Sequence, residues 1–127
     1  MVEPEISPVS YLFYKFMHPE PVVMNEFPLS DRTFEPHRDP FESNQAIPHL
    51  LLTKYRNDFE TKFKNLKIIK YQRFSCFSYV LSGGFRNWCL LPFTMAPAVL
   101  KLENFITPII APIAAFRLLA VIEKQKN

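Results

Sequence analysis

The prolines of this chain are placed so unevenly that they decide where regular secondary structure can form. Seven of the twelve prolines lie within residues 1–40 of the 127-residue chain. Proline lacks an amide hydrogen and clashes with a preceding helical turn, so this region cannot hold a long regular element. One short helix is predicted over residues 8–18, because Ser7 can cap it, Pro8 suits its first turn and Pro19 ends it.

The segment from Pro19 to Pro40 predicts an extended surface loop or a lid. It carries PEPVVMNEFPLSDRTFEPHRDP and has no helical or strand periodicity. A loop of this length inside a compact domain is uncommon and is more often functional than idle.

The clearest helical pattern covers residues 44–65. Five apolar side chains recur at a spacing of four along one face: Ile47, Leu51, Tyr55, Phe59 and Phe63. Pro48 fits only in the first turn. One long helix is therefore predicted here.

The rest of the chain alternates between strand and helix patterns. β-Branched and aromatic residues predict one long or kinked strand over residues 66–82. One or two short helices interrupted by prolines are predicted within residues 88–113, and a final strand over residues 116–123. The order of elements indicates an α/β fold in one domain, residues 1–127.

The composition favours a globular protein and limits its partners. Hydrophobic residues make up 48% of the chain and aromatic residues 15%, which excludes a disordered polypeptide. The net charge of +3 comes from scattered basic residues, whereas nucleic-acid binding requires clustered ones. The two cysteines form no CxxC motif, and no signal peptide is visible, which predicts free thiols and a cytoplasmic location. The three histidines are too scattered for a metal site.

An apolar run over residues 105–122 raises the question of a membrane. It is 18 residues long and holds one charge, Arg117. Pro108 and Pro112 interrupt its first half, so a broken helix followed by a buried strand is the preferred interpretation. Peripheral contact with a membrane remains an alternative.

The first seven residues, MVEPEIS, have the pattern of a buried parallel strand that leaves the carboxyl edge of a sheet. Pro4 keeps the segment extended and sends the carboxylates of Glu3 and Glu5 to the same side. At such an edge they could face a substrate amine or hydroxyl. The alternative is a solvated loop.

Five short motifs, taken together, resemble those of a known family. They are the acidic-proline pair Glu3-Pro4, HPEPV at residues 18–22, NQAIP at 44–48, LSGGF at 81–85 and FRLLAVIEK at 116–124. In this order the chain resembles the C-terminal half of bacterial class I S-adenosylmethionine-dependent methyltransferases. The resemblance covers nearly the whole chain and implies an antiparallel final strand and a partial Rossmann-like sheet.

The resemblance also implies what the chain would lack. The family builds its cofactor site from the first strand, a glycine-rich turn and an acidic residue after the second strand, all of which would precede Met1. With two glycines in the chain, no GxGxG motif is present. The resemblance therefore implies a substrate-side portion that does not bind S-adenosylmethionine alone and is inactive without an N-terminal half. A non-enzymatic interaction module or a membrane-peripheral module is the alternative function.

The two glycines, Gly83 and Gly84, predict a turn with positive φ at the end of a strand. A phosphate-binding loop needs more glycines and usually a lysine. The alternative is that the turn lets the backbone approach a ligand, with Phe85, Arg86 and Trp88 forming one wall of a pocket.

His18 precedes Pro19 and could lie near the carboxyl edge of the sheet with Glu3 and Glu5. A general base there has suitable chemistry, and a surface or helix-capping histidine is the alternative. The aromatic residues of the first helix could line an apolar substrate pocket or simply pack the helix: Tyr11, Phe13, Tyr14 and Phe16. No catalytic residue is assigned.

Overall fold

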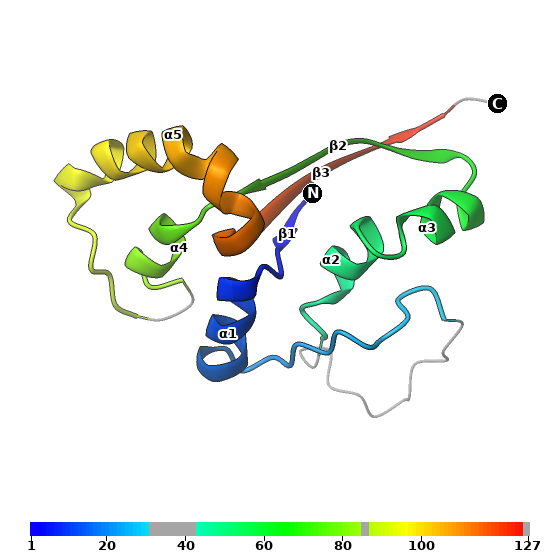
Figure 1. Ribbon diagram of the computed structural model, residues 1–127, viewed down its shortest axis with the longest axis horizontal. Helices are drawn as coiled ribbons and strands as arrows, with labels where there is room; N and C mark the ends of the chain where they lie inside the picture. The colour runs from blue at the N-terminus through cyan, green and yellow to red at the C-terminus, as the bar shows by residue number, and fades with distance from the viewer. Residues whose placement is uncertain (31–42, 85–86, 126–127) are drawn as a thin grey trace.

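A small antiparallel sheet joins the two ends of the chain (Figure 1). The computed structural model describes residues 1–30, 43–84 and 87–125. Its elements are β1 (Val2–Pro4), α1 (Pro8–Met17), α2 (Ile47–Leu52), α3 (Arg56–Lys62), β2 (Leu66–Phe74), α4 (Phe77–Leu81), a 3-10 turn η1 (Phe93–Met95), α5 (Ala96–Ala114) and β3 (Arg117–Lys124). The α/β class is thus confirmed at the level of a mixed fold.

The last strand lies at the centre of the sheet. The strand order is β1-β3-β2, and β3 is antiparallel to both neighbours, so β1 and β2 run in the same direction. Glu3 lies opposite Leu118, and a bulge between Ile68 and Lys70 shifts the register of β2. The sequence predicts a buried parallel strand at the start, and this is wrong. The strand β1 pairs antiparallel with β3, and Val2 is 54% exposed.

The predicted first helix is confirmed as α1. The Ser7 side chain accepts a hydrogen bond from the Ser10 amide at 3.2 Å, and Ser10 Oγ accepts one from the Ser7 amide at 2.8 Å. This reciprocal capping satisfies two amides that the first turn leaves without partners. At the other end, the buried Tyr14 hydroxyl donates to the Phe116 carbonyl at 2.8 Å and ties α1 to the start of β3.

The predicted helix over residues 44–65 is wrong in its length. It is interrupted at Thr53, whose φ of −120° and ψ of −83° leave the helical region, and α2 and α3 are separate helices. The interruption allows Leu50 to join the cluster around Tyr14 and Phe116, while Phe59 packs with the β-sheet residues of a second cluster. A straight helix could not reach both clusters.

The predicted strand over residues 66–82 is also too long. β2 ends at Phe74, Ser75 turns the chain with φ of +57°, and residues 77–81 form helix α4. The buried Glu103 carboxylate of α5 accepts hydrogen bonds from the amides of Cys76 and Ser78. It thus gives partners to amides that the first turn of α4 leaves without a helical acceptor.

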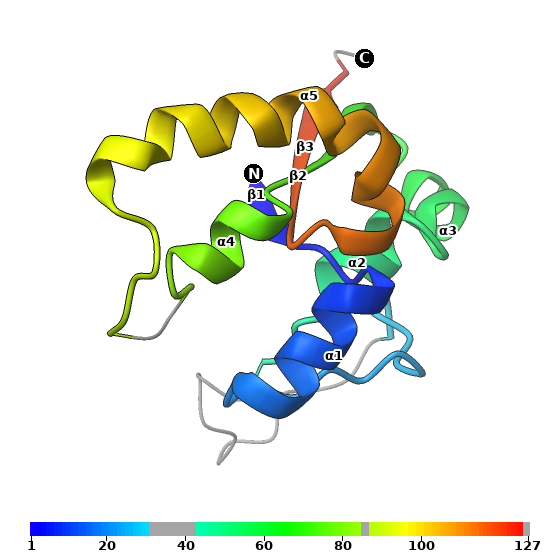
Figure 2. The same cartoon turned by 60° about the vertical axis from the view of Figure 1, so that its left-hand side comes forward.

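Helix α5 continues through both of its prolines and bends in its second half (Figure 2). By length and composition alone, the stretch Phe93–Ala114 is apolar enough to cross a membrane, as are many core helices. Unlike a core helix, only 17% of its apolar window is buried. In Figure 1, α4 and α5 lie at the left end of β2 and β3, and α2 and α3 lie below these strands.

Candidate functional site

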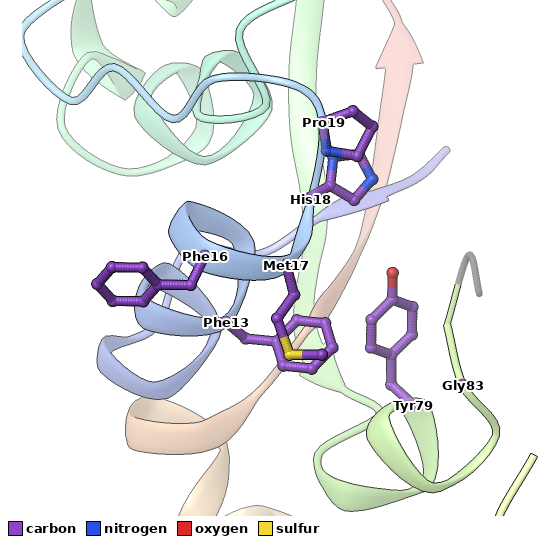
Figure 3. A pocket seen from close by; sticks show the side chains of 7 residues that line it. All are labelled: Phe13, Phe16, Met17, His18, Pro19, Tyr79 and Gly83. Atoms are coloured by element: carbon purple, nitrogen blue, oxygen red, sulfur yellow. The ribbon is translucent and has the colours of Figure 1, made fainter. Parts of the chain in front are cut away.

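A pocket of about 320 Å³ opens between the end of α1 and the turn after α4 (Figure 3). It is lined by Phe13, Phe16, Met17, His18, Pro19, Tyr79 and Gly83. His18 and Gly83 are distant in sequence, and both are predicted site residues. The structure therefore brings two of the predicted residues onto one site.

The last turns of α1 supply the apolar wall of the pocket. Phe13 is partly buried and meets Tyr79 edge to face with ring centroids 6.2 Å apart, whereas Phe16 is 75% exposed. Tyr14, between them in sequence, points into the core instead. Phe13 and Phe16 thus line a pocket, whereas Tyr14 packs in the core.

His18 caps the C-terminal end of α1 and is held by neighbouring segments. Its amide donates to the Tyr14 carbonyl at 3.1 Å, and its Nδ1 accepts a hydrogen bond from the Glu20 amide at 3.2 Å. The Gln45 side-chain nitrogen lies 2.6 Å from the same Nδ1. The same Gln45 nitrogen lies 3.0 Å from His18 Nε2, so both ring nitrogens of His18 contact this side chain.

The segment after His18 is fastened to the start of α2 by Asn44. The Asn44 side chain accepts from the Val23 amide at 2.9 Å and donates to the Val23 carbonyl at 2.8 Å and to Glu26 Oε2 at 2.7 Å. It also accepts from the Ala46 amide at 3.0 Å. Every hydrogen-bonding position of this amide has a partner. Gln45 in turn contacts His18, Glu20 and the Pro21 carbonyl, so residues 18–26 and 44–46 form one hydrogen-bonded unit, which the sequence does not reveal.

Tyr79 forms the opposite wall of the pocket. Its ring stacks on Phe116 with centroids 5.1 Å apart, and the Arg117 guanidinium carbon lies 5.0 Å from its centroid. Figure 3 shows its ring on the α4 side of the pocket, and its hydroxyl oxygen is buried. Burial raises the pKa of Tyr79 above its usual value, although Arg117 and Tyr14 oppose the shift. The hydroxyl thus stays protonated at neutral pH.

The two glycines form the predicted turn with positive φ, at +86° for Gly83 and +56° for Gly84. The turn ends a helix rather than a strand: the Gly84 amide donates to the Tyr79 carbonyl at 3.1 Å. A Cβ atom on Gly84 would lie 2.9 Å from Tyr79 Cζ. Gly84 therefore makes room for the Tyr79 ring, which fixes one wall of the pocket.

The other residues predicted for this wall do not contribute in the same way. Phe85 and Arg86 lie outside the described residues, as do residues 31–42 of the predicted lid. Trp88 is half-buried and is not among the residues that line the pocket. Helical spacing could have revealed Tyr79, because it lies four residues before Gly83, but the apolar pattern of residues 77–81 predicted a strand.

Glu3 and Glu5 do not line the pocket either. Glu5 is fully buried, which contradicts a solvated loop. Its carboxylate accepts from Arg73 Nε at 2.6 Å and from the Tyr71 hydroxyl at 2.8 Å, and His49 Nδ1 lies 3.2 Å from it. Burial raises the pKa of Glu5, but His49, Tyr71 and Arg73 outweigh burial, and the net pKa is below its usual range. Glu5 is thus a buried anion held by side chains of β2 and α2.

The pocket does not fit S-adenosylmethionine as a whole. The cofactor presents a ribose diol and a charged amino-acid group, and the described lining residues include no Asp, Glu, Lys or Arg. Nor do the described residues contain a group of His, Cys, Asp and Glu able to hold a metal ion. The described lining of the pocket is mostly apolar and aromatic, with His18 and Tyr79 as its polar side chains.

Comparison with protein-family models, curated proteins and solved structures gives no match to this chain. The resemblance to methyltransferases therefore stays a prediction from the sequence.

Proposed function

We propose that this chain forms the substrate-side portion of an S-adenosylmethionine-dependent methyltransferase and positions the methyl acceptor. The observation that carries the proposal is the pocket at the end of α1. It joins His18 and Pro19 of the HPEPV motif to Gly83 of the LSGGF motif. Two of the motifs that carry the resemblance thus contribute residues to one pocket.

The contacts of Asn44 add a third motif to this site. Asn44 and Gln45 begin NQAIP, and they bind the backbone of Val23 and Pro21 and the ring of His18. Three motifs that are separate in sequence thus form one structure around the pocket. A chance similarity of short motifs gives no reason for such convergence.

The direction of β3 gives independent support. The resemblance implies an antiparallel final strand, and β3 is antiparallel to both β1 and β2. On this proposal the chain acts in the cytoplasm and contributes positioning, which accounts for much of the rate of a transfer reaction. On the same proposal the pocket receives the methyl acceptor, and the cofactor site belongs to the N-terminal half.

The proposal is tested by measuring S-adenosylmethionine binding with calorimetry. The purified chain is titrated alone and after mixing with a methyltransferase N-terminal half that carries the glycine-rich turn. We expect binding heat beyond that of the N-terminal half alone only when both chains are present. Tight binding by this chain alone would refute our account of the cofactor site, and no gain from the mixture would refute the split enzyme.

A second candidate function is favoured by the surface of α5. The exposed apolar side chains of this region include Phe105, Ile109 and Ile113, which repeat every four residues on one helix face. Such a helix is suited to lying on a membrane surface or on another protein. Co-sedimentation with anionic liposomes that disappears at high salt would support peripheral membrane attachment in place of the methyltransferase function.

A further inference from the structure

Helix α5 exposes an apolar stripe with the spacing of a contact between two helices. Exposed apolar residues recur at alternating intervals of three and four: Met95, Ala98, Leu102, Phe105, Ile109 and Pro112. Phe105 is 81% exposed and Ile109 is 78% exposed. This alternation is that of the a and d positions of a heptad, which line up along one side of a helix and face a second helix. Figures 1 and 2 both show α5 at the margin of the molecule, where another chain can reach it.

The charges of α5 restrict what covers this stripe. The helix contains two charged residues, Lys101 and Glu103, and the Glu103 carboxylate is buried against the first turn of α4. A helix that lies on an anionic membrane carries several lysines or arginines beside its apolar face. Within Ala96–Ala114 only Lys101 is available for that purpose. The stripe therefore fits another protein helix better than an anionic lipid surface.

The order of large and small side chains makes the stripe complementary to itself. In an antiparallel pair of helices, a positions of one helix face d positions of the other. With the greatest overlap of two stripes, Ala98 of one copy faces Ile109 of the second copy, and Leu102 faces Phe105. Each layer then pairs a smaller side chain with a larger one, which allows close packing. In a parallel pair Ala98 would face Ala98 and Phe105 would face Phe105, so a gap would lie one turn or two from a crowded layer.

We infer that α5 is the contact surface between two copies of this chain, which pair antiparallel along the stripe from Ala98 to Ile109. Both copies use the same patch, so the contact is isologous and closes as a dimer. Pairing removes from water the apolar side chains that the single chain exposes, which is its driving force. The inference does not depend on the proposed function, because the residues that line the pocket at the end of α1 lie outside α5.

Two leucines of α5 provide a matched pair of variants. Leu102 is 56% exposed and belongs to the stripe, whereas Leu100 is 48% exposed and lies about 160° away around the helix. Leu102→Ser should raise the dissociation constant of the dimer at least about tenfold, because each dimer loses two buried leucine side chains. Leu100→Ser should leave this constant at the wild-type value. Sedimentation equilibrium measures both constants, and the far-ultraviolet circular dichroism of each variant establishes that it is folded.

Cysteine cross-linking tests the antiparallel direction. Cys89 is exposed and is first replaced by serine, whereas Cys76 is buried and stays. In this background the Ala98→Cys chain and the Ile109→Cys chain are treated separately and as a mixture. The thiol cross-linker is shorter than about 16 Å, the rise of eleven helical residues. We expect covalent dimers in the mixture alone, because residues 98 and 109 face each other only across an antiparallel pair.

Three results would overturn the inference: a chain that stays monomeric at its highest soluble concentration, equal weakening in both leucine variants, or cross-linking of either cysteine variant by itself. A monomeric chain that co-sediments with anionic liposomes would also overturn it and would assign the stripe to a membrane surface. A failure to bind S-adenosylmethionine with an N-terminal half would leave these outcomes unchanged and would refute the methyltransferase role alone.

Discussion

Glu5 illustrates how far apart in the sequence the partners of one buried side chain can lie. Its carboxylate meets Arg73 and Tyr71 from β2 and His49 from α2. A buried carboxylate without such partners would be strongly unfavourable, and removing a partner leaves an uncompensated charge. Glu5 therefore holds the start of the chain against β2, and its charge is needed for stability.

The lowered pKa of Glu5 predicts a pH dependence of stability. A folded-state pKa below the unfolded value, near 4.5, means that the carboxylate contributes stability above that pH and loses it as the pH falls through the folded-state pKa. Glu5→Gln should lower the free energy of unfolding by about 3 kcal/mol near neutral pH. Urea unfolding should show this difference shrinking as the pH falls below about 4.5.

Glu60→Gln is the control, because Glu60 forms a half-exposed pair with Arg56 at 3.1 Å. Pairs of this kind contribute at most about 1 kcal/mol. A Glu5→Gln difference that stayed constant with pH would contradict the role of the Glu5 charge.

The contact between Gly84 and Tyr79 predicts that Gly84→Ala destabilises the chain. The backbone at φ of +56° disfavours any side chain by about 1–2 kcal/mol, and the new Cβ would lie 2.9 Å from Tyr79 Cζ. Gly84→Asn separates the two causes, since asparagine tolerates this backbone region but still carries a Cβ. Thermal unfolding should show both variants to be less stable; a fully stable Gly84→Asn would mean that backbone strain, and not the ring contact, explains the glycine.

Among the helices and strands, those with local end signals were predicted well and the others were not. Helix α1 has a serine cap and flanking prolines, so its bounds follow from local chemistry. The break between α2 and α3 has no proline or glycine to mark it. It depends on where Leu50 and Phe59 find their separate clusters, which local periodicity cannot show.

The segment that ends in LSGGF also shows that local patterns do not settle the secondary structure. Its β-branched and aromatic residues predict a strand, yet residues 77–81 are helical because Ser75 turns the chain and the Glu103 carboxylate caps the first turn of α4. Ser75 lies inside the predicted strand, whereas Glu103 lies on another helix. A capping group 25 residues away from Ser78 is invisible to any local pattern.

The link between the proline-rich segment and α2 predicts the effect of Asn44→Ala. The change leaves the amide and carbonyl of Val23 without their side-chain partner, at a cost of about 1–3 kcal/mol in the free energy of unfolding. We expect faster amide hydrogen exchange at Val23 than in the wild type. Asn57→Ala, at an exposed position of α3, is the control and should leave this exchange rate unchanged; equal protection of Val23 in Asn44→Ala would show that other contacts hold the segment.

The exposed apolar face of α5 affects the molecule as a whole. The described surface exposes Phe105, Ile109 and Ile113 together on this helix. Contiguous apolar surface of this kind marks an interaction site or promotes association. The chain is thus expected to associate in solution and to be marginally stable when isolated.

Sedimentation velocity at micromolar concentration tests this expectation. The double variant Phe105→Ser/Ile109→Ser should shift the chain toward monomer, because it makes the α5 face polar. Val9→Ser/Leu12→Ser, which alters exposed apolar residues of α1, is the matched control and should leave association unchanged. A monomeric wild-type chain with a sharp, cooperative unfolding transition would contradict the prediction.

The sequence determined the features that depend on a few neighbouring residues: the capped helix α1, the positive-φ turn at Gly83 and Gly84, the apolar final strand and the mixed α/β class. These follow from local backbone sterics and hydrogen bonding, which a short segment contains within itself. The pocket was decided by the tertiary structure. His18, Tyr79 and Gly83 meet because Tyr14 fastens α1 to β3, Tyr79 stacks on Phe116, and Asn44 holds the segment after His18. Each of these contacts joins residues distant in sequence, and such contacts form only when the chain closes into its tertiary structure.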